Sequence, residues 1–143
     1  MTYLILAAIL LGADSARRDL RSYRLPNSHS LAILFIGCVV NGFSKCMASA
    51  LLVSGFYMLL YFLSGRNIGF GDVKFAGACS SVLSHQSETL GAFLLLTWTL
   101  GVLHLVIVRW RRSEWARKIP LGPSIYLSMV ALLGARWWTS LSQ

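Results

Sequence analysis

The sequence predicts an all-α, polytopic membrane protein with six transmembrane helices. Of its 143 residues, 56% are hydrophobic and only 13% are charged, whereas a soluble domain carries about 25% charged residues. The mean hydropathy of +0.64 is equally typical of an integral membrane protein. Short polar or basic segments separate the apolar runs, and no repeat or change of composition divides the chain. We therefore expect one membrane-embedded domain over residues 1–143.

The first predicted helix has an apolar segment that is too short to cross a membrane by itself. The six expected spans cover residues 2–18, 29–43, 46–63, 73–84, 88–109 and 120–140. The apolar part of the first span, Tyr3 to Gly12, is shorter than the roughly 20 residues that a span needs, so its helix should continue past the membrane face. The run has the length of a signal-peptide core, but no Lys or Arg precedes it and basic residues follow it. We therefore expect a retained first span whose N-terminus lies on the outer, non-cytoplasmic side of the membrane.

Local signals set the boundaries of the second and third helices. Pro26 should end the first helix at or before Leu25, and Ser28 or Ser30 can then cap the second. Asn41-Gly42 is a turn signal between the second and third helices. The third helix also carries small residues suited to close helix contacts: Ser49, Ser54 and Gly55.

The last three helices differ strongly in character. Ser64 to Asn67 interrupts the apolar pattern before the fourth run, which is short and rich in Ala, Gly, Cys and Ser, so we expect it to pack among the others. A polar turn at Ser84 to Ser87 leads into the longest run. A basic, solvated loop from Arg109 to Lys118 follows, and Pro120 opens the sixth helix. That helix ends with two aromatic residues typical of a membrane interface: Trp137 and Trp138.

The basic residues predict the orientation in the membrane. With the N-terminus outside, the inner loops would cover residues 17–28, 64–74 and 109–119. Of the 13 Lys and Arg residues, only Lys45 and Arg136 lie elsewhere. Positive loops face the cytoplasm, so the pattern predicts a multi-pass protein of the inner (plasma) membrane with both termini outside. The same pattern explains the net charge of +8 without nucleic acid as a partner.

The sequence offers no metal or cofactor site. Cys38, Cys46 and Cys79 lie in or beside apolar segments without a CxxC spacing, so we interpret them as small buried hydrophobic residues. The three histidines form no cluster with ligand spacing. We therefore expect the chain to work without a metal or cofactor.

Asp19 and Asp72 are the candidate catalytic residues. The chain has only five acidic residues, and a carboxylate at the edge of an apolar segment is expensive unless it serves a function. The predicted topology brings both aspartates to the cytoplasmic face. Two carboxylates that share a site hold a proton between them, so one can activate water while the other polarises a scissile carbonyl. Asp14 is the rival for Asp19, but it has Arg17 and Arg18 as local partners.

Two glycines precede Asp72 in the segment from Gly69 to Lys74. Gly69 and Gly71 would allow a strained backbone and close approach of a substrate strand, and Gly71 would leave open space beside the carboxylate. The competing interpretation is a flexible turn in which Asp72 is the N-cap of a helix and Lys74 an interfacial anchor. The Asp19 segment favours the catalytic interpretation.

Three segments together resemble the prepilin peptidase family of GxGD aspartic proteases. Asp19 to Asn27, which includes Arg21 and Pro26, is similar to the family's first motif, an aspartate seven residues before the proline of Leu-Pro-Asn. Gly69 to Lys74 resembles the second motif. Ile119 to Pro123 looks like the Pro-x-Gly-Pro segment that often opens the last span. The order of the motifs and the expected span count match over essentially the whole chain.

The resemblance implies a membrane-embedded aspartic endopeptidase. Such enzymes remove the leader of type IV prepilins, pseudopilins or related pilins at the cytoplasmic face, typically after a glycine. By resemblance Asp19 and Asp72 would be catalytic, and Gly69, Gly71 and Lys74 would support them. The lipid bilayer and a prepilin or pseudopilin are the expected partners, while nothing in the sequence predicts an oligomeric state. The chain lacks the cytoplasmic domain with CxxC motifs of the bifunctional members, so it resembles the short, peptidase-only form without N-methyl transfer.

Two other functions remain open from the sequence. A relative of presenilin or signal peptide peptidase would also carry GxGD, but those chains are much longer and hold their other aspartate in a Tyr-Asp context. A small proton-coupled transporter or a pilus or secretion assembly subunit could use Asp19 and Asp72 to relay protons. Cleavage of a prepilin by the purified protein would exclude the transporter.

Overall fold

The computed structural model describes residues 1–22, 24–64, 68–83, 87–112 and 121–141, and these residues form helices and no strand. The all-α prediction is confirmed. The helices are α1 (Thr2–Ser22), α2 (Asn27–Asn41), α3 (Phe43–Leu63), α4 (Phe70–Val82), α5 (Ser87–Arg112) and α6 (Gly122–Leu141).

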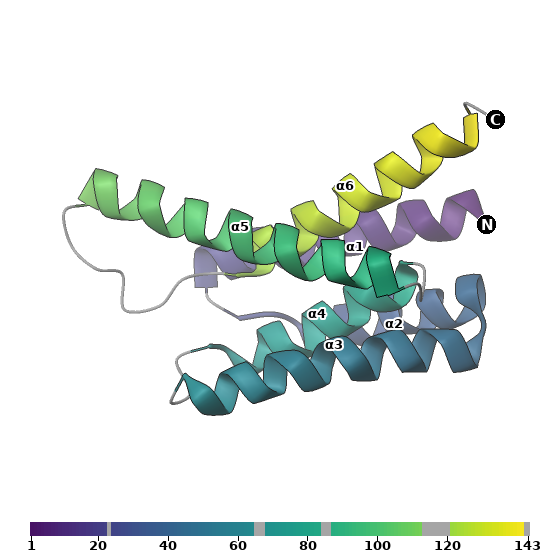
Figure 1. The fold of residues 1–143 in the computed structure, drawn as a ribbon, viewed down its shortest axis with the longest axis horizontal. Coiled ribbons are helices and arrows are strands. Elements are labelled where there is room, and N and C mark those ends of the chain that lie inside the picture. The colour runs from purple at the N-terminus through teal and green to yellow at the C-terminus, as the bar shows by residue number, and fades with distance from the viewer. Residues whose placement is uncertain (23, 65–67, 84–86, 113–120, 142–143) are drawn as a thin grey trace.

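Successive helices run in opposite directions (Figure 1). Both chain termini lie at one end of the bundle, together with the turn between α2 and α3. That turn contains Gly42, whose φ of 81° lies in the left-handed region that glycine adopts readily. The C-terminal ends of α1, α3 and α5 lie at the opposite end. These are the ends that lead into the three predicted inner loops. The segments that carry Asp19 and Asp72 therefore share one end of the molecule.

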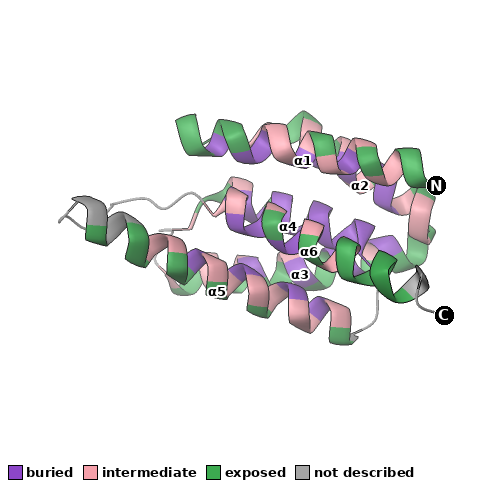
Figure 2. Ribbon diagram, turned by 90° about the horizontal axis from the view of Figure 1, so that it is seen from above, coloured by how far each residue is buried: buried purple, intermediate pink, exposed green. Residues whose placement is uncertain are grey.

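Helix α4 is the centre of the bundle (Figure 2). It packs mainly against α3 and α2, with further contacts to α6 and α1. Every residue from Phe75 to Val82 is buried. The helix comes this close to its neighbours because small residues meet: Gly77 lies against Ser54 of α3, and Ser81 lies against Gly37 of α2. The prediction that the fourth run packs among other helices is confirmed.

The C-terminal end of α4 is held by a side chain from α2. The Asn41 amide nitrogen donates to the carbonyl oxygens of Ser81, Val82 and Leu83 at 2.9, 3.1 and 3.1 Å. These carbonyls have no partner within their own helix because α4 ends there. Asn41 thus fixes this end of α4 beside the turn between α2 and α3.

Two of the described helical segments are long and apolar enough to cross a membrane: Phe43–Leu63 and Glu88–Ile107. Only 28% and 22% of the residues in these windows are buried, unlike the core helix of a soluble protein. Their outer faces expose large apolar side chains that water would disfavour. Among them are Leu51, Leu52, Leu59, Phe62, Leu95, Val102 and Leu103. The other four expected spans remain predictions, because α2 and α4 are short and α1 and α6 do not pass the same test.

Several local predictions are corrected. Pro26, with φ −70° and ψ 125°, is the N-cap of α2 and makes no side-chain cap, so Ser28 and Ser30 lie inside the helix instead of capping it. Gly55 has no atom within 4 Å of its would-be Cβ and is not a contact residue. Helix α5 continues to Arg112, so the start of the expected basic loop is helical.

Some predicted boundaries fall on residues that the structure does not describe. The interruption at Gly65–Asn67, most of the polar turn at 84–86, and the loop at 113–120 with Pro120 lie outside the described residues.

Candidate active site

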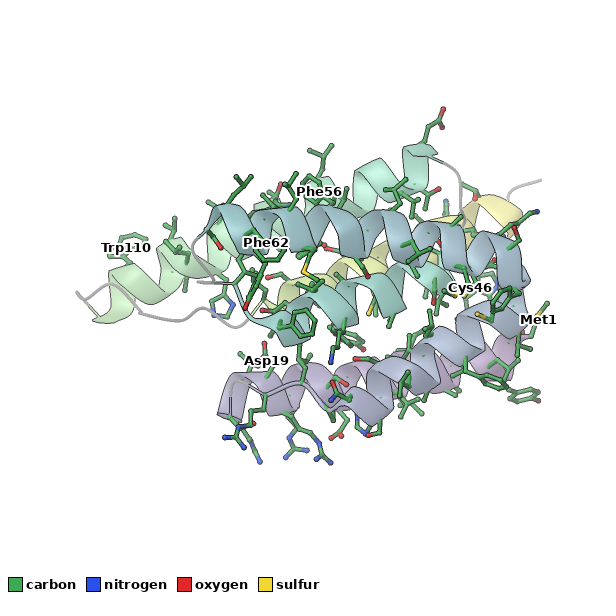
Figure 3. All side chains as sticks on the ribbon, turned by 90° about the horizontal axis from the view of Figure 1, so that it is seen from below. Met1, Asp19, Cys46, Phe56, Phe62 and Trp110 are labelled. Atoms are coloured by element: carbon green, nitrogen blue, oxygen red, sulfur yellow. The ribbon has the colours of Figure 1, made fainter. Side chains whose placement is uncertain are left out.

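Asp19 is a buried carboxylate on an otherwise charged, exposed turn of α1. Its exposed fraction is 4%, whereas Arg17, Arg18 and Arg21 around it are exposed. Figure 3 shows Asp19 at the end of the molecule opposite Met1 and Cys46. One Asp19 oxygen, Oδ2, accepts a hydrogen bond of 3.0 Å from the backbone N–H of Gly122. Gly122 begins α6, and a helix N-terminus favours a negative charge.

Asp72 lies in the first turn of α4 and is also buried, with an exposed fraction of 6%. Its Oδ2 accepts a hydrogen bond of 3.2 Å from the Gly69 N–H, and its own N–H donates to the Gly69 carbonyl oxygen at 3.0 Å. Gly69 is therefore the N-cap of α4, and the interpretation of Asp72 as the N-cap is wrong.

Burial raises the pKa of both carboxyl groups, and the charge of Asp19 also acts on Asp72. Burial and the charge of Asp19 raise the pKa of Asp72 to about 7, and the hydrogen bond from Gly69 opposes this rise. Burial also raises the pKa of Asp19, and the Gly122 hydrogen bond opposes this rise. Two carboxyl groups that interact in this way release their protons as a pair, so at neutral pH the pair can hold one proton.

The glycines act through space and not through backbone strain. Gly69 has φ −70°, which any residue can adopt. A Cβ there would lie 2.9 Å from Asp72 Oδ2, so a side chain would displace the carboxylate. A Cβ on Gly71 would lie 3.3 Å from Leu25 Cβ. The predictions of a strained backbone, and of open space at Gly71, are therefore wrong.

The other predicted supporting residues, Lys74, Pro26 and Arg21, have different surroundings in the structure. Lys74 is exposed, donates from Nζ to Asn27 Oδ1 at 3.3 Å and lies 4.8 Å from the centroid of the Phe70 ring. This contact joins the start of α4 to the start of α2. Pro26 sets the entry of α2 one residue earlier. Arg21 is exposed on α1, and no contact brings it to either aspartate.

Asp14 does not join Asp19 and Asp72. Its Oδ2 lies 2.7 Å from Arg18 Nε and 3.6 Å from Nδ1 of His29, and its side chain is 43% exposed. The predicted partnership with Arg18 is confirmed. In the described part of the chain, no group of three or more His, Cys, Asp and Glu residues could hold a metal ion.

Two buried, electrostatically coupled carboxyl groups at one end of a helical bundle suit acid–base chemistry, and the family comparison agrees. A model of the type IV leader peptidase family matches residues 3–107, more than half of the chain. The chain belongs to the type IV leader peptidase family. Members of this family are proteases of the aspartic type and are typically membrane-embedded. Comparisons with curated proteins and with solved structures give no match.

Gly122 is the site residue that the sequence analysis missed. It lies beyond the part of the chain that the family model matches, yet its N–H contacts Asp19 across 103 positions of sequence. A signal was present, because Gly122 belongs to the Pro-x-Gly-Pro segment at 120–123. That segment predicted only the start of a helix, since sequence spacing alone does not reveal which carboxylate the N–H meets.

Proposed function

We propose that the protein is a membrane-embedded aspartic endopeptidase that removes the N-terminal leader of type IV prepilin-like proteins, with Asp19 and Asp72 as its catalytic residues. The observation that carries the proposal is the burial of these two carboxyl groups at one end of the bundle, close enough for Asp19 to raise the pKa of Asp72. Family membership supports the same reaction class.

The chemistry follows from one proton shared by two carboxyl groups. The ionised carboxylate takes a proton from a water molecule, whose oxygen attacks the scissile carbonyl carbon. The protonated partner donates a hydrogen bond to the carbonyl oxygen, and a proton is then delivered to the leaving amine. A pKa of about 7 for Asp72 leaves both protonation states accessible at neutral pH. The proton belongs to the pair, so neither aspartate is assigned a fixed role.

The placement in the membrane rests on charge. Asp19 lies near the end of α1, where Arg17, Arg18 and Arg21 are exposed, and Arg24 just beyond the helix is exposed too. Positive loops face the cytoplasm, which supports cleavage at the cytoplasmic face of the plasma membrane. The expected substrate is a prepilin or pseudopilin whose leader lies at that face.

The proposal is tested with purified protein in detergent and a candidate prepilin, followed by mass analysis of the pilin N-terminus. The intact chain should remove the leader, and Asp19→Asn and Asp72→Asn should lower the rate by at least about a thousandfold, since loss of either group removes the shared proton. Asp14→Asn is the matched control, because this carboxylate is exposed and pairs with Arg18.

Each outcome has a distinct meaning. Cleavage by the intact chain and by Asp14→Asn, but by neither of the other variants, supports the assignment. Cleavage that survives in both Asp19→Asn and Asp72→Asn overturns the catalytic pair. Proton flux without cleavage of any prepilin would favour a transporter instead.

A further inference from the structure

Two polar groups lie unpaired in the core between α3 and α5. Tyr57 of α3 is fully buried, and its ring stacks on that of Trp98 in α5 with centroids 6.2 Å apart and planes 26° apart. Neither the Tyr57 hydroxyl nor the buried Trp98 Nε1–H has a hydrogen-bond partner that meets ordinary geometry among the described residues. Two donors on stacked neighbouring rings thus lack an acceptor.

Such donors are costly to keep. A buried hydrogen-bonding group without a partner costs about 1–3 kcal/mol, and nearly all buried polar groups in native proteins are paired with protein or water. A phenylalanine at position 57 would supply the same ring for stacking without that cost. The hydroxyl therefore calls for an explanation other than packing.

Tyr57 lies on the side of α3 that approaches Asp72. One turn earlier on α3, Ser54 Oγ donates to the Val73 carbonyl oxygen at 3.4 Å and lies against Gly77. Tyr57 is three residues closer to the end of α3 that meets the start of α4, and the Asp72 charge acts on its hydroxyl. Thr97 Oγ1 lies beside the same hydroxyl without reaching hydrogen-bonding geometry, and its hydrogen goes to the Phe93 carbonyl oxygen at 2.8 Å.

We propose that the Tyr57 hydroxyl and the Trp98 N–H bind a buried water molecule, and that Tyr57 through this water positions the Asp72 carboxylate. A water molecule accepts two hydrogen bonds and still has two hydrogens to donate, so it satisfies both donors and can donate to Asp72. Tyr57 is then a positioning residue and not a catalytic residue, since it is fully buried and acts through Asp72. The inference deepens the proposed peptidase function and rests on it for its kinetic consequences.

The first test is Tyr57→Phe, with Tyr61→Phe as the matched control. Tyr61 lies one turn further along α3, is only partly buried, and packs edge-on against Phe62 and Phe70. Loss of the Tyr57 hydroxyl should lower kcat on the order of tenfold with little change in KM, because a hydrogen bond to a charged group is lost. Thermal stability should fall slightly, because the hydrogen bond between the Tyr57 hydroxyl and the buried water is lost. Tyr61→Phe should behave like the intact chain.

The second test does not need cleavage. The infrared carbonyl band of a buried protonated carboxyl group, followed over pH and assigned by its loss in Asp72→Asn, reports the titration of Asp72. Its midpoint should rise in Tyr57→Phe, because the ionised form loses a hydrogen bond. The titratable groups that face Asp72 are Asp19 on α1 and Tyr57 on α3. On its own helix Lys74 follows two residues later, with its amine held at Asn27, and Cys79 lies near Tyr57.

The outcomes separate this inference from the peptidase proposal. A raised midpoint in Tyr57→Phe supports the positioning role even if no prepilin is cleaved, a result that would count against the peptidase function alone. An unchanged midpoint in Tyr57→Phe overturns the inference. So does a raised KM with unchanged kcat, since it would mean that Tyr57 contacts substrate.

Discussion

Replacing Gly122 by alanine should displace Asp19 and inactivate the enzyme. A Cβ at position 122 would lie 2.7 Å from Asp19 Oδ2, 3.0 Å from its Cβ and 3.1 Å from its Cγ. The conflict reaches the Cβ of Asp19, so a rotation of the carboxylate alone does not relieve it. The 3.0 Å hydrogen bond from the Gly122 N–H would lengthen as the side chain moves.

The size of the effect follows from these contacts. Overpacking of a buried site costs about 1–3 kcal/mol of folding free energy, and a displacement of about 1 Å in a catalytic group lowers the rate by about a hundredfold. Thermal unfolding in detergent measures the first effect, and prepilin cleavage measures the second.

Gly134→Ala is the matched control for Gly122→Ala. Gly134 lies in the same helix and has no atom within 4 Å of its would-be Cβ. Alanine is the better helix former, so this variant should keep its activity and be as stable or slightly more stable. Equal activity in Gly122→Ala and Gly134→Ala would refute the contact between Gly122 and Asp19.

Three further predictions concern pH and the packing of α4. The pKa of Asp72 rises from 3.8 to about 7 on folding, so the folded state binds more protons and stability should fall as pH rises through this interval. A series of melting temperatures over pH should show a smaller fall in Asp72→Asn than in the intact chain. Asn41→Ala should cost about 1–3 kcal/mol in unfolding experiments, because the carbonyls that end α4 lose their donor, with little change in kcat. Gly77→Ala should destabilise the bundle through its conflict with α3, where a Cβ would also lie 3.1 Å from a carbonyl oxygen, whereas Gly55→Ala, with open space around it, should not.

Local patterns predicted the helices well. Hydrophobic runs, Pro26 and the Asn41-Gly42 turn are properties of neighbouring residues, and the helix order follows from them. The boundaries were less accurate, because the N-cap of α2 depends on the backbone conformation at Pro26 and not on a nearby serine.

The sequence predicted the candidate site as a pair of aspartates, but it did not predict the geometry around them. Asp19 and Asp72 stand out because carboxylates are rare in this chain. Their hydrogen-bond donors, Gly122 and Gly69, are backbone groups, which any sequence offers at every position. Likewise the burial of Tyr57 beside Trp98 depends on how α3 and α5 pack, and helical periodicity alone does not define that register.

The brevity of α4 sets how a substrate chain can reach the aspartates. At 1.5 Å per residue, its 13 residues span about 20 Å, whereas the 21 residues of α3 span about 31 Å. Ser80 of α4 donates to the Ser49 carbonyl oxygen at 3.2 Å and Phe70 packs against Tyr61, so α3 extends beyond α4 at both ends, and Asp72 lies below the end of α3. An extended peptide gains about 3.3–3.6 Å of depth per residue, but an intact helix keeps its carbonyls engaged in its own hydrogen bonds. For the proposed cleavage, the rate should therefore depend on how easily the segment at the cut unwinds, and a glycine there would ease it.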